Sequence, residues 1–201
     1  MGFSYIDHFE INEKKETKEA SSLDELTKNI QRCHLCDLSK SRKQSMPGYG
    51  GKDANLLIVD YLVSQTQDNT NNYYAGRSGE SLQKMIENVL QLSIEEVYLT
   101  HAIKCKPLQS NRPSSSEWNS CKSYLLSQIE LIKPKVLVTL GEDAYSHLTN
   151  DSVENFENVR GHVIDYKNIK LIPIYHPQFL LRNPELKKLT LNDLHTIKSC
   201  L

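Results

Sequence analysis

The stretch Asn55-Leu-Leu-Ile-Val-Asp-Tyr-Leu62 decides the fold, because it is a largely apolar run that begins soon after a Gly-rich turn. A run of this length between turn signals is typical of a strand buried on both faces of a sheet. The segments that follow alternate between two kinds, with strands expected at 97–100, 136–140, 163–166 and 170–175, and helices at 81–92, 115–132 and 185–200.

This alternation predicts an α/β sandwich around a largely parallel sheet. In such sheets ligands bind beyond the carboxyl ends of the strands. We therefore expect functional residues in the loops that follow residues 62, 100, 140 and 175.

The domain organisation follows from length and from local signals. A chain of 201 residues with 38% hydrophobic content can bury one good core. We expect a flexible leader over residues 1–20 and a single domain over residues 21–201. Ser22-Leu-Asp-Glu25 has the form of a capping box, which predicts a helix over 23–32 that delivers Cys33. The amide-rich stretch 64–72 predicts a polar loop.

Composition limits the cellular setting. The chain shows neither a long apolar span nor a signal-peptide pattern, which predicts a cytoplasmic protein with no membrane contact. A net charge of −1 gives no overall attraction to nucleic acid. Basic residues around the later motifs could form a local basic face or be scattered in solvent, and the sequence leaves both readings open. They are Lys104, Lys106, Arg112, Arg160, Arg182, Lys187 and Lys188.

Four of the five cysteines have a spacing that suggests a metal centre. Cys33-His-Leu-Cys36 is a C-x-x-C pair, and Cys105 and Cys121 follow at a distance. Disulfides are not expected in a reducing compartment. This set is compatible with tetrahedral zinc, with a [4Fe–4S] cluster or with unrelated buried thiols, and His34 and Cys200 are spare ligands.

Several motifs in order resemble the iron–sulfur (family four) uracil-DNA glycosylases. The resemblance runs from about Cys33 to Lys187. The segment at 175–184, Tyr-His-Pro-Gln-Phe-Leu-Leu-Arg-Asn-Pro, is its most specific part. The other matching segments are Cys33-x-x-Cys36-x-Leu38 with Arg42, Pro47-Gly-Tyr-Gly50, Tyr74-Ala-Gly-Arg-Ser-Gly79, Ile103-Lys-Cys-Lys-Pro107, Asn111-Arg-Pro113, Cys121-x-x-Tyr-Leu125, Leu131-Ile-Lys-Pro-Lys-Val136, Leu140-Gly141 with Ala144, and Arg160-Gly161.

The resemblance implies a fold, a cofactor and a substrate. The fold is an α/β three-layer sandwich with a central, mostly parallel four-stranded sheet flanked by helices. It implies a [4Fe–4S] cluster held by Cys33, Cys36, Cys105 and Cys121, with no role for Cys200. It also implies a monomer that binds DNA at a flipped or single-stranded nucleotide and hydrolyses the N-glycosidic bond of uracil or another deaminated base in base-excision repair.

The same resemblance assigns roles to individual residues. His176 matches the pocket histidine that donates toward uracil O2, and Tyr74 occupies the position of a stacking phenylalanine. Leu180, Leu181 and Arg182, with Gln178 before them, match a loop that probes DNA with an apolar wedge and a cation.

The chain departs from the family in the loop after the first buried strand. The family's Gly-Glu-Ala-Pro-Gly aligns with Asp60-Tyr-Leu-Val-Ser64, so Tyr61 replaces the water-handling glutamate. Asp68 is what remains of a later acidic pair, and His101 replaces an asparagine that reads uracil. We therefore assign His176, Asp60 and Asp68 to catalysis, and Tyr61, Tyr74 and His101 to the base pocket.

Three functions stay open at this point. The first is a DNA glycosylase, the second is a cluster-containing relative that binds DNA without cleaving it, and the third is a protein that keeps only the cluster.

Overall fold

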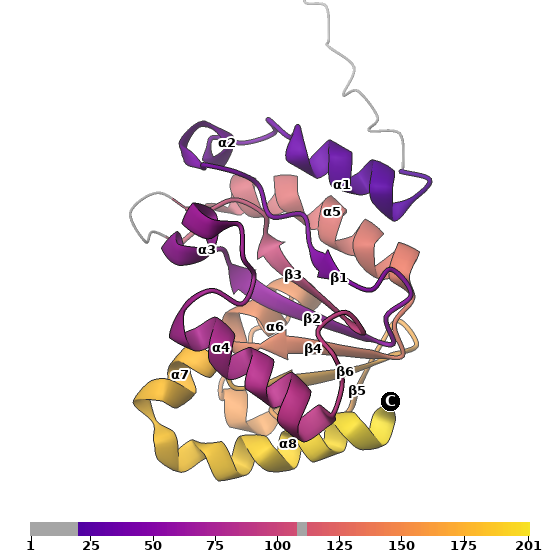
Figure 1. Cartoon of the computed structure of the whole chain (residues 1–201), viewed down its shortest axis with the longest axis vertical. Coiled ribbons are helices and arrows are strands. Elements are labelled where there is room, and N and C mark those ends of the chain that lie inside the picture. Colours follow the sequence, from indigo (N-terminus) through magenta and orange to yellow (C-terminus); the bar gives the residue numbers. More distant parts are fainter. Residues whose placement is uncertain (1–19, 108–111) are drawn as a thin grey trace, which may run out of the picture.

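The computed structural model describes residues 20–107 and 112–201 and contains one six-stranded sheet between two layers of helices (Figure 1). The strands lie in the order β1-β3-β2-β4-β6-β5. The four central strands are parallel, and the short strands β1 and β5 are antiparallel edges. The bounds are β1 Tyr49–Gly50, β2 Leu56–Leu62, β3 Val97–Ile103, β4 Val136–Leu140, β5 Ile164–Tyr166 and β6 Ile169–Ile174.

Each face of the sheet carries its own helices. Helices α5 and α6 cover one face, and α1 packs on the outside of α5. Helices α4 and α8 cover the other face. The bounds are α1 Leu23–Gln31, α2 Leu38–Ser41, α3 Gln65–Thr70, α4 Gly76–Lys84, α5 Ser115–Ile132, α6 Gly141–Thr149, α7 Pro177–Arg182 and α8 Lys187–Cys200.

Strand β2 shows why this sequence forms the middle of a sandwich. Leu57 and Val59 pack against the α5–α6 layer, whereas Leu56 and Ile58 pack against the α4–α8 layer. Successive side chains of a strand point to opposite faces, so a strand covered on both sides must be apolar at every position. The predicted fold class is confirmed, with two short antiparallel strands added to the four parallel ones.

Several predicted elements agree with the structure, whereas the helix expected over 81–92 begins earlier, at Gly76, and the stretch 64–72 also differs. The predictions for 56–62, 115–132 and 136–140 match β2, α5 and β4. The stretch 64–72 was wrongly expected to be only a loop, because it contains helix α3. Ser64 begins that helix with a capping box, in which its side chain accepts from the N–H of Gln67 and the Gln67 side chain accepts from the N–H of Ser64.

Two parts of the sequence interpretation lie outside the described residues. They are nearly all of the expected leader, residues 1–19, and Asn111 of the Asn-Arg-Pro motif. Within the described ranges, no helix combines the length and the apolar character that crossing a bilayer requires.

The topology brings three strand ends together. Strand β4 lies between β2 and β6, and all three run in the same direction. Their carboxyl ends therefore meet at one edge of the sheet, where residues far apart in the sequence can form a single site.

Candidate functional site

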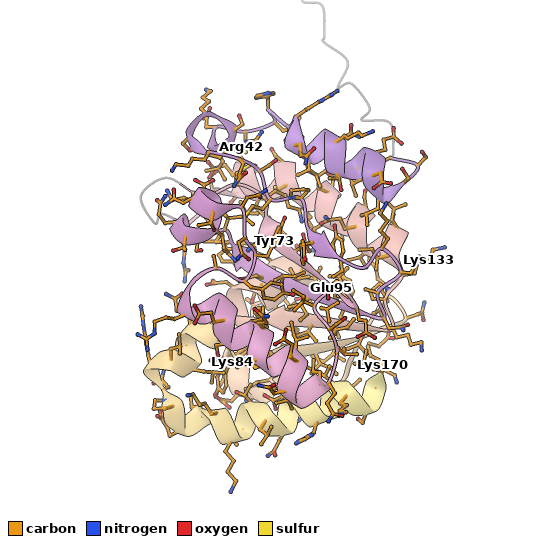
Figure 2. The ribbon with its side chains drawn as sticks, in the orientation of Figure 1. Arg42, Tyr73, Lys84, Glu95, Lys133 and Lys170 are labelled. Atoms are coloured by element: carbon orange, nitrogen blue, oxygen red, sulfur yellow. The ribbon has the colours of Figure 1, made fainter. Side chains whose placement is uncertain are left out.

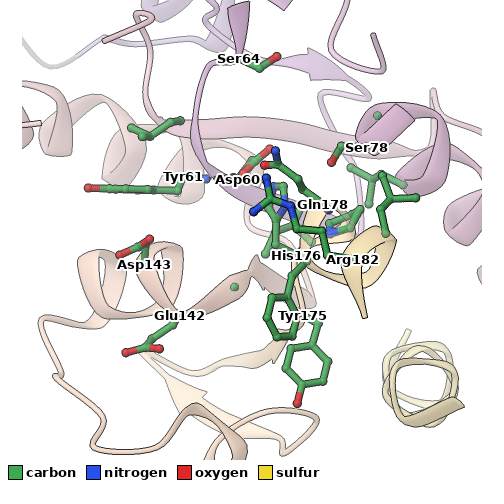
Figure 3. A pocket seen from close by; sticks show the side chains of 18 of the residues that line it. Asp60, Tyr61, Ser64, Ser78, Glu142, Asp143, Tyr175, His176, Gln178 and Arg182 are labelled. Atoms are coloured by element: carbon green, nitrogen blue, oxygen red, sulfur yellow. Dashed lines mark hydrogen bonds and ion pairs between the residues drawn. The ribbon is translucent and has the colours of Figure 1, made fainter. Parts of the chain in front are cut away.

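A cleft of about 1110 Å³ opens at the carboxyl ends of β2, β4 and β6. Its floor includes Asp60 from β2, Gly141 after β4 and His176 after β6. Helices α4 and α7 contribute further walls (Figure 3). A cavity of this size can admit a nucleotide.

Asp60 and His176 form a hydrogen-bonded pair on this floor. The Nε2 atom of His176 lies 3.1 Å from Oδ1 of Asp60. His176 is the N-cap of α7, and its Nδ1 accepts from the backbone N–H of Gln178 at 3.0 Å. Because that N–H fills the lone pair of Nδ1, the neutral ring carries its proton on Nε2.

The pair is electrostatically coupled. Burial works to raise the pKa of Asp60, but the neighbouring imidazoles of His176 and His101 outweigh it and leave the pKa lowered. Burial works to lower the pKa of His176, and Asp60 raises it above its ordinary value. The cleft floor therefore holds a carboxylate beside a proton-bearing imidazole.

Gly141 allows this close approach. It adopts a φ of +84°, which disfavours residues that carry a Cβ. A Cβ atom there would also lie 3.3 Å from Cβ of His176. The glycine at the end of β4 thus provides the room in which His176 can reach toward β2.

His101 lies behind Asp60 and does not line the cleft. Its side chain is fully buried, and Nε2 is 3.9 Å from Oδ2 of Asp60, beyond hydrogen-bonding distance. Within the described residues neither ring nitrogen has a hydrogen-bond partner. Burial lowers the pKa of His101 to about 4, so the ring is neutral near pH 7.

The tyrosines assigned to the base pocket lie on different sides. Tyr61 lines the cleft and stacks on His147 with ring centroids 4.7 Å apart, and Figure 3 shows it pointing toward the helix that carries Asp143. Tyr74 packs in the core under α4 and does not line the cleft. The aromatic ring that does line this part of the cleft belongs to Tyr73, near the centre of Figure 2.

Asp68 is buried away from the cleft and holds a neighbouring segment. Its Oδ1 accepts from the backbone N–H groups of Lys43 and Gln44 at 3.1 and 3.4 Å. The side-chain amide of Gln44 donates to the Asp68 carbonyl. These contacts give Asp68 a structural task and leave Asp60 as the carboxylate next to His176.

The residues of α7 that were predicted to contact DNA differ in how deeply they are buried. Gln178, Leu181 and Arg182 line the cleft, whereas Leu180 is fully buried. The large apolar side chain that α7 presents to solvent is Phe179, which is 45% exposed. The apolar surface expected from the sequence is therefore supplied by Phe179 and Leu181.

Charge divides the rim of the cleft. Arg77 at the start of α4 and Arg182 at the end of α7 stand on one side. The other wall carries four exposed carboxylates, those of Glu142, Asp143, Glu154 and Glu157, and one arginine, Arg112, which lies 3.6 Å from Asp143. Two of the lysines and arginines considered for a basic face contribute little to it, because Lys104 is buried and Arg160 is paired with Asp193.

The four predicted cluster ligands line a second, small cavity near α1, α2 and α5. Cys33 and Cys36 follow α1, Cys105 follows β3 and Cys121 lies in α5, whereas Cys200 is elsewhere at the end of α8. Among the described residues, no three His, Cys, Asp or Glu side chains are arranged to hold one metal ion. A four-iron cluster has a different requirement, since each cysteine binds a separate iron and the sulfurs stand further apart.

Hydrogen-bond donors surround these thiols. Arg42 donates from Nη1 to Sγ of Cys105 at 2.9 Å and from Nη2 to the carbonyl of Cys33 at 2.8 Å. Figure 2 shows Arg42 near helices α1 and α2. The backbone N–H of Lys104 donates to Sγ of Cys121 at 3.4 Å. Donors of this kind stabilise negative charge on sulfur, which fits a thiolate-bound cluster.

A buried hydrogen-bond network extends from the cysteine cavity into strand β3. The ammonium group of Lys104 donates to the hydroxyl of Thr100, to the carbonyl of His101 and to the side chain of Gln128. Burial lowers the pKa of this lysine to about 7. The sequence did not predict that Lys104 is a buried hydrogen-bond donor, because nothing in the pattern Ile103-Lys-Cys105 shows which way the lysine points.

Comparison with known proteins agrees with this geometry. The profile of the Uracil DNA glycosylase superfamily matches residues 47–195, so the chain belongs to that superfamily. A type-4 uracil-DNA glycosylase of Saccharolobus solfataricus is 32% identical, and the match covers 90% of this chain and 87% of that protein. The chain therefore belongs to the type-4 family.

Two further relatives show the same coverage. The type-4 uracil-DNA glycosylase of Sulfurisphaera tokodaii is 30% identical over 88% of this chain and 84% of its own length. That of Thermotoga maritima is 32% identical over 87% of this chain and 92% of its own length. The resemblance noted at the glycine, cysteine and His-Pro motifs thus extends through most of the domain.

Proposed function

We propose that this chain is a DNA glycosylase that removes uracil from DNA and initiates base-excision repair. The observation that carries the proposal is the pair formed by Asp60 and His176 on the floor of a nucleotide-sized cleft. The names of the type-4 relatives support uracil as the base. The pair supplies a carboxylate close to an imidazole donor, which a relative that only binds DNA would not need.

The reaction breaks the bond between C1′ of the sugar and N1 of uracil. The bonding electrons leave with N1, and negative charge spreads onto uracil O2. When substrate binds, His176 would turn its Nε2–H from Asp60 to that oxygen and stabilise the leaving base. Water then forms the new bond to C1′, and its proton passes to Asp60 and from there to solvent.

Asp60 can take the water-handling role of the family's glutamate, which Tyr61 replaces in this sequence. Its Oδ1 accepts from His176 and from the N–H of Tyr61, whereas Oδ2 accepts no hydrogen bond from a described residue. A lowered pKa keeps the carboxylate ionised at neutral pH. An ionised carboxylate also stabilises positive charge on the sugar as the base departs.

We further propose that Cys33, Cys36, Cys105 and Cys121 hold a [4Fe–4S] cluster. When bound, the cluster would cross-link three separate segments of the chain. Replacing any one of these cysteines by alanine should lower the iron content, whereas Cys200→Ala should leave it unchanged. Zinc without iron in the purified protein would contradict the assignment.

We propose that residues 21–201 form one domain, which acts as a monomer in the cytoplasm. Its substrate is a flipped or single-stranded nucleotide.

The test of function is abasic-site formation in uracil-containing oligonucleotides. Asp60→Asn and His176→Ala should each lower kcat by about 100-fold or more. Asp165→Asn is the matched control, because Asp165 is exposed on β5 and does not line the cleft. Retained DNA affinity without any base release by the wild-type protein would overturn the proposal in favour of a relative that only binds.

A further inference from the structure

Phe179 is exposed in an unusual place. Among the described residues six large hydrophobic side chains are exposed, and Phe179 is the one of these that lines the cleft. It lies on α7, three residues after His176, and its backbone N–H donates to the His176 carbonyl at 2.9 Å. The backbone of Phe179 is therefore fixed next to His176, the residue that would contact the extruded base.

The ring of Phe179 has a rigid support beneath it. It packs against Tyr175 with ring centroids 5.1 Å apart and planes tilted by 31°. Tyr175 is buried, and its ring centroid lies 6.0 Å from that of Phe156. The guanidinium of Arg160 lies 5.2 Å from the centre of the Tyr175 ring. An aromatic side chain that is already ordered loses little conformational entropy when a ligand stacks on its open face.

The charges around the cleft fix which part of DNA can reach this ring. Arg77 and Arg182 form no ion pair with a described residue, and α4 and α7, which carry them, pack together. On the opposite wall Asp143 is paired with Arg112 and Glu157 with Arg160, so the carboxylates there that repel phosphates are those of Glu142 and Glu154. A strand is thus attracted along the α4–α7 side by its phosphates, while its uncharged bases face the aromatic rings. Figure 3 shows Arg182 and Tyr175 on one side and Glu142 and Asp143 on the other.

We propose that Phe179, supported by Tyr175 and Phe156, is a stacking shelf for the nucleobase that neighbours the extruded nucleotide on the same strand. The ligand class is an unpaired base of single-stranded DNA, recognised by its π-face and not by its sequence. The inference rests on the proposed function for its substrate, but it concerns binding of the neighbouring base and not bond cleavage.

A chemical double-mutant cycle tests the shelf. The probe is a single-stranded oligonucleotide with a non-cleavable 2′-fluoro-deoxyuridine, in which the 5′ or the 3′ neighbour is replaced by an abasic analogue. Removing one of these neighbours should weaken binding to the wild-type protein about 5- to 100-fold. Phe179→Ala should weaken binding to the intact probe by a similar factor and should no longer respond to the missing base.

Three comparisons keep the outcome decisive. Phe179→Trp should retain the affinity, and Phe179→Leu should lose it, because leucine keeps apolar bulk without a stacking face. Leu189→Ala is the control, since Leu189 is 40% exposed on α8 outside the cleft. Wild-type affinity of Phe179→Leu, or additive losses in the cycle at both neighbours, would overturn the shelf.

Failure of the proposed function would look different. A wild-type protein that shows the coupled losses but forms no abasic sites keeps the shelf and loses the glycosylase assignment. Normal uracil excision with uncoupled losses keeps the glycosylase assignment and removes the shelf.

Discussion

Asp60 on β2 and His176 after β6 meet across β4, with Oδ1 and Nε2 3.1 Å apart. The two strands are not neighbours, so the contact depends on how far each side chain reaches over the end of β4. Gly141 follows the last residue of β4, and its missing side chain leaves room for His176.

Gly141→Ala should therefore impair excision more than stability. The positive φ makes alanine cost about 1–2 kcal/mol, and the new methyl group would press on Cβ of His176. We expect kcat on a uracil oligonucleotide to fall at least tenfold. Gly76→Ala is the control, because Gly76 has a φ of +78° but nothing closer than 3.9 Å to an added Cβ. Equal loss of kcat at saturating DNA in both variants would contradict this role of Gly141.

His101 should make the protein sensitive to acid. Burial lowers its pKa from 6.5 to about 4, so below pH 6.5 the unfolded chain takes up a proton that the folded chain does not. The stability of the folded state therefore falls as the pH drops from 6.5 toward 4, by roughly 3 kcal/mol in total.

His101→Asn should remove the part of the pH-dependent stability that His101 causes. The free energy of urea unfolding should change less between pH 7.5 and pH 4.5 in the variant than in the wild-type protein. The exposed His195 on α8 gives a control, and His195→Asn should keep the wild-type pH dependence. Identical pH slopes for His101→Asn and the wild type would show that the ring does not stay neutral in the fold.

Asp68→Asn should weaken the fold without removing the chemistry. The carboxylate accepts two backbone N–H groups from Lys43 and Gln44, and an amide replaces a charged acceptor by a neutral one. The loss of stability should be about 1–3 kcal/mol, measured by urea unfolding. Asp165→Asn, at an exposed position on β5, should have no such effect. A large fall in kcat with unchanged stability would return Asp68 to the catalytic group.

Arg42→Met should make the proposed cluster less durable. The guanidinium donates to Sγ of Cys105 and to the carbonyl of Cys33, so its removal leaves the sulfur without a charged donor. We expect faster loss of the brown colour on exposure to air or a chelator. Arg32→Met, at an exposed position at the end of α1, is the control. Equal rates of bleaching in the two variants would argue that Arg42 only shapes the loop.

The strands and long helices could be predicted because each carries its own signal. β2 and β4 are apolar at nearly every position, and α5 has helical spacing that begins at a capping serine. The start of α4 could not be found in this way, since the residues Gly76-Arg-Ser-Gly-Glu80 have no apolar periodicity. Helix α3 had a signal in Ser64-x-x-Gln67 that the polar composition concealed.

The site was only partly predictable, because side-chain direction depends on the three-dimensional turn. The pair Leu180-Leu181 has the composition of an apolar wedge, but α7 begins at Pro177 and this phase turns Leu180 into the core and Phe179 outward. The two adjacent tyrosines at 73 and 74 show the same problem, since only the contacts of the fold reveal which ring lines the cleft.

The two edge strands have a consequence for behaviour at high concentration. β1 contains two residues and β5 contains three, and each lies antiparallel against the outermost parallel strand. They leave few unpaired amide groups along the borders of the sheet, so a second molecule finds little backbone on which to extend the ladder. Concentrated solutions of this protein should accordingly resist growth of intermolecular β-structure.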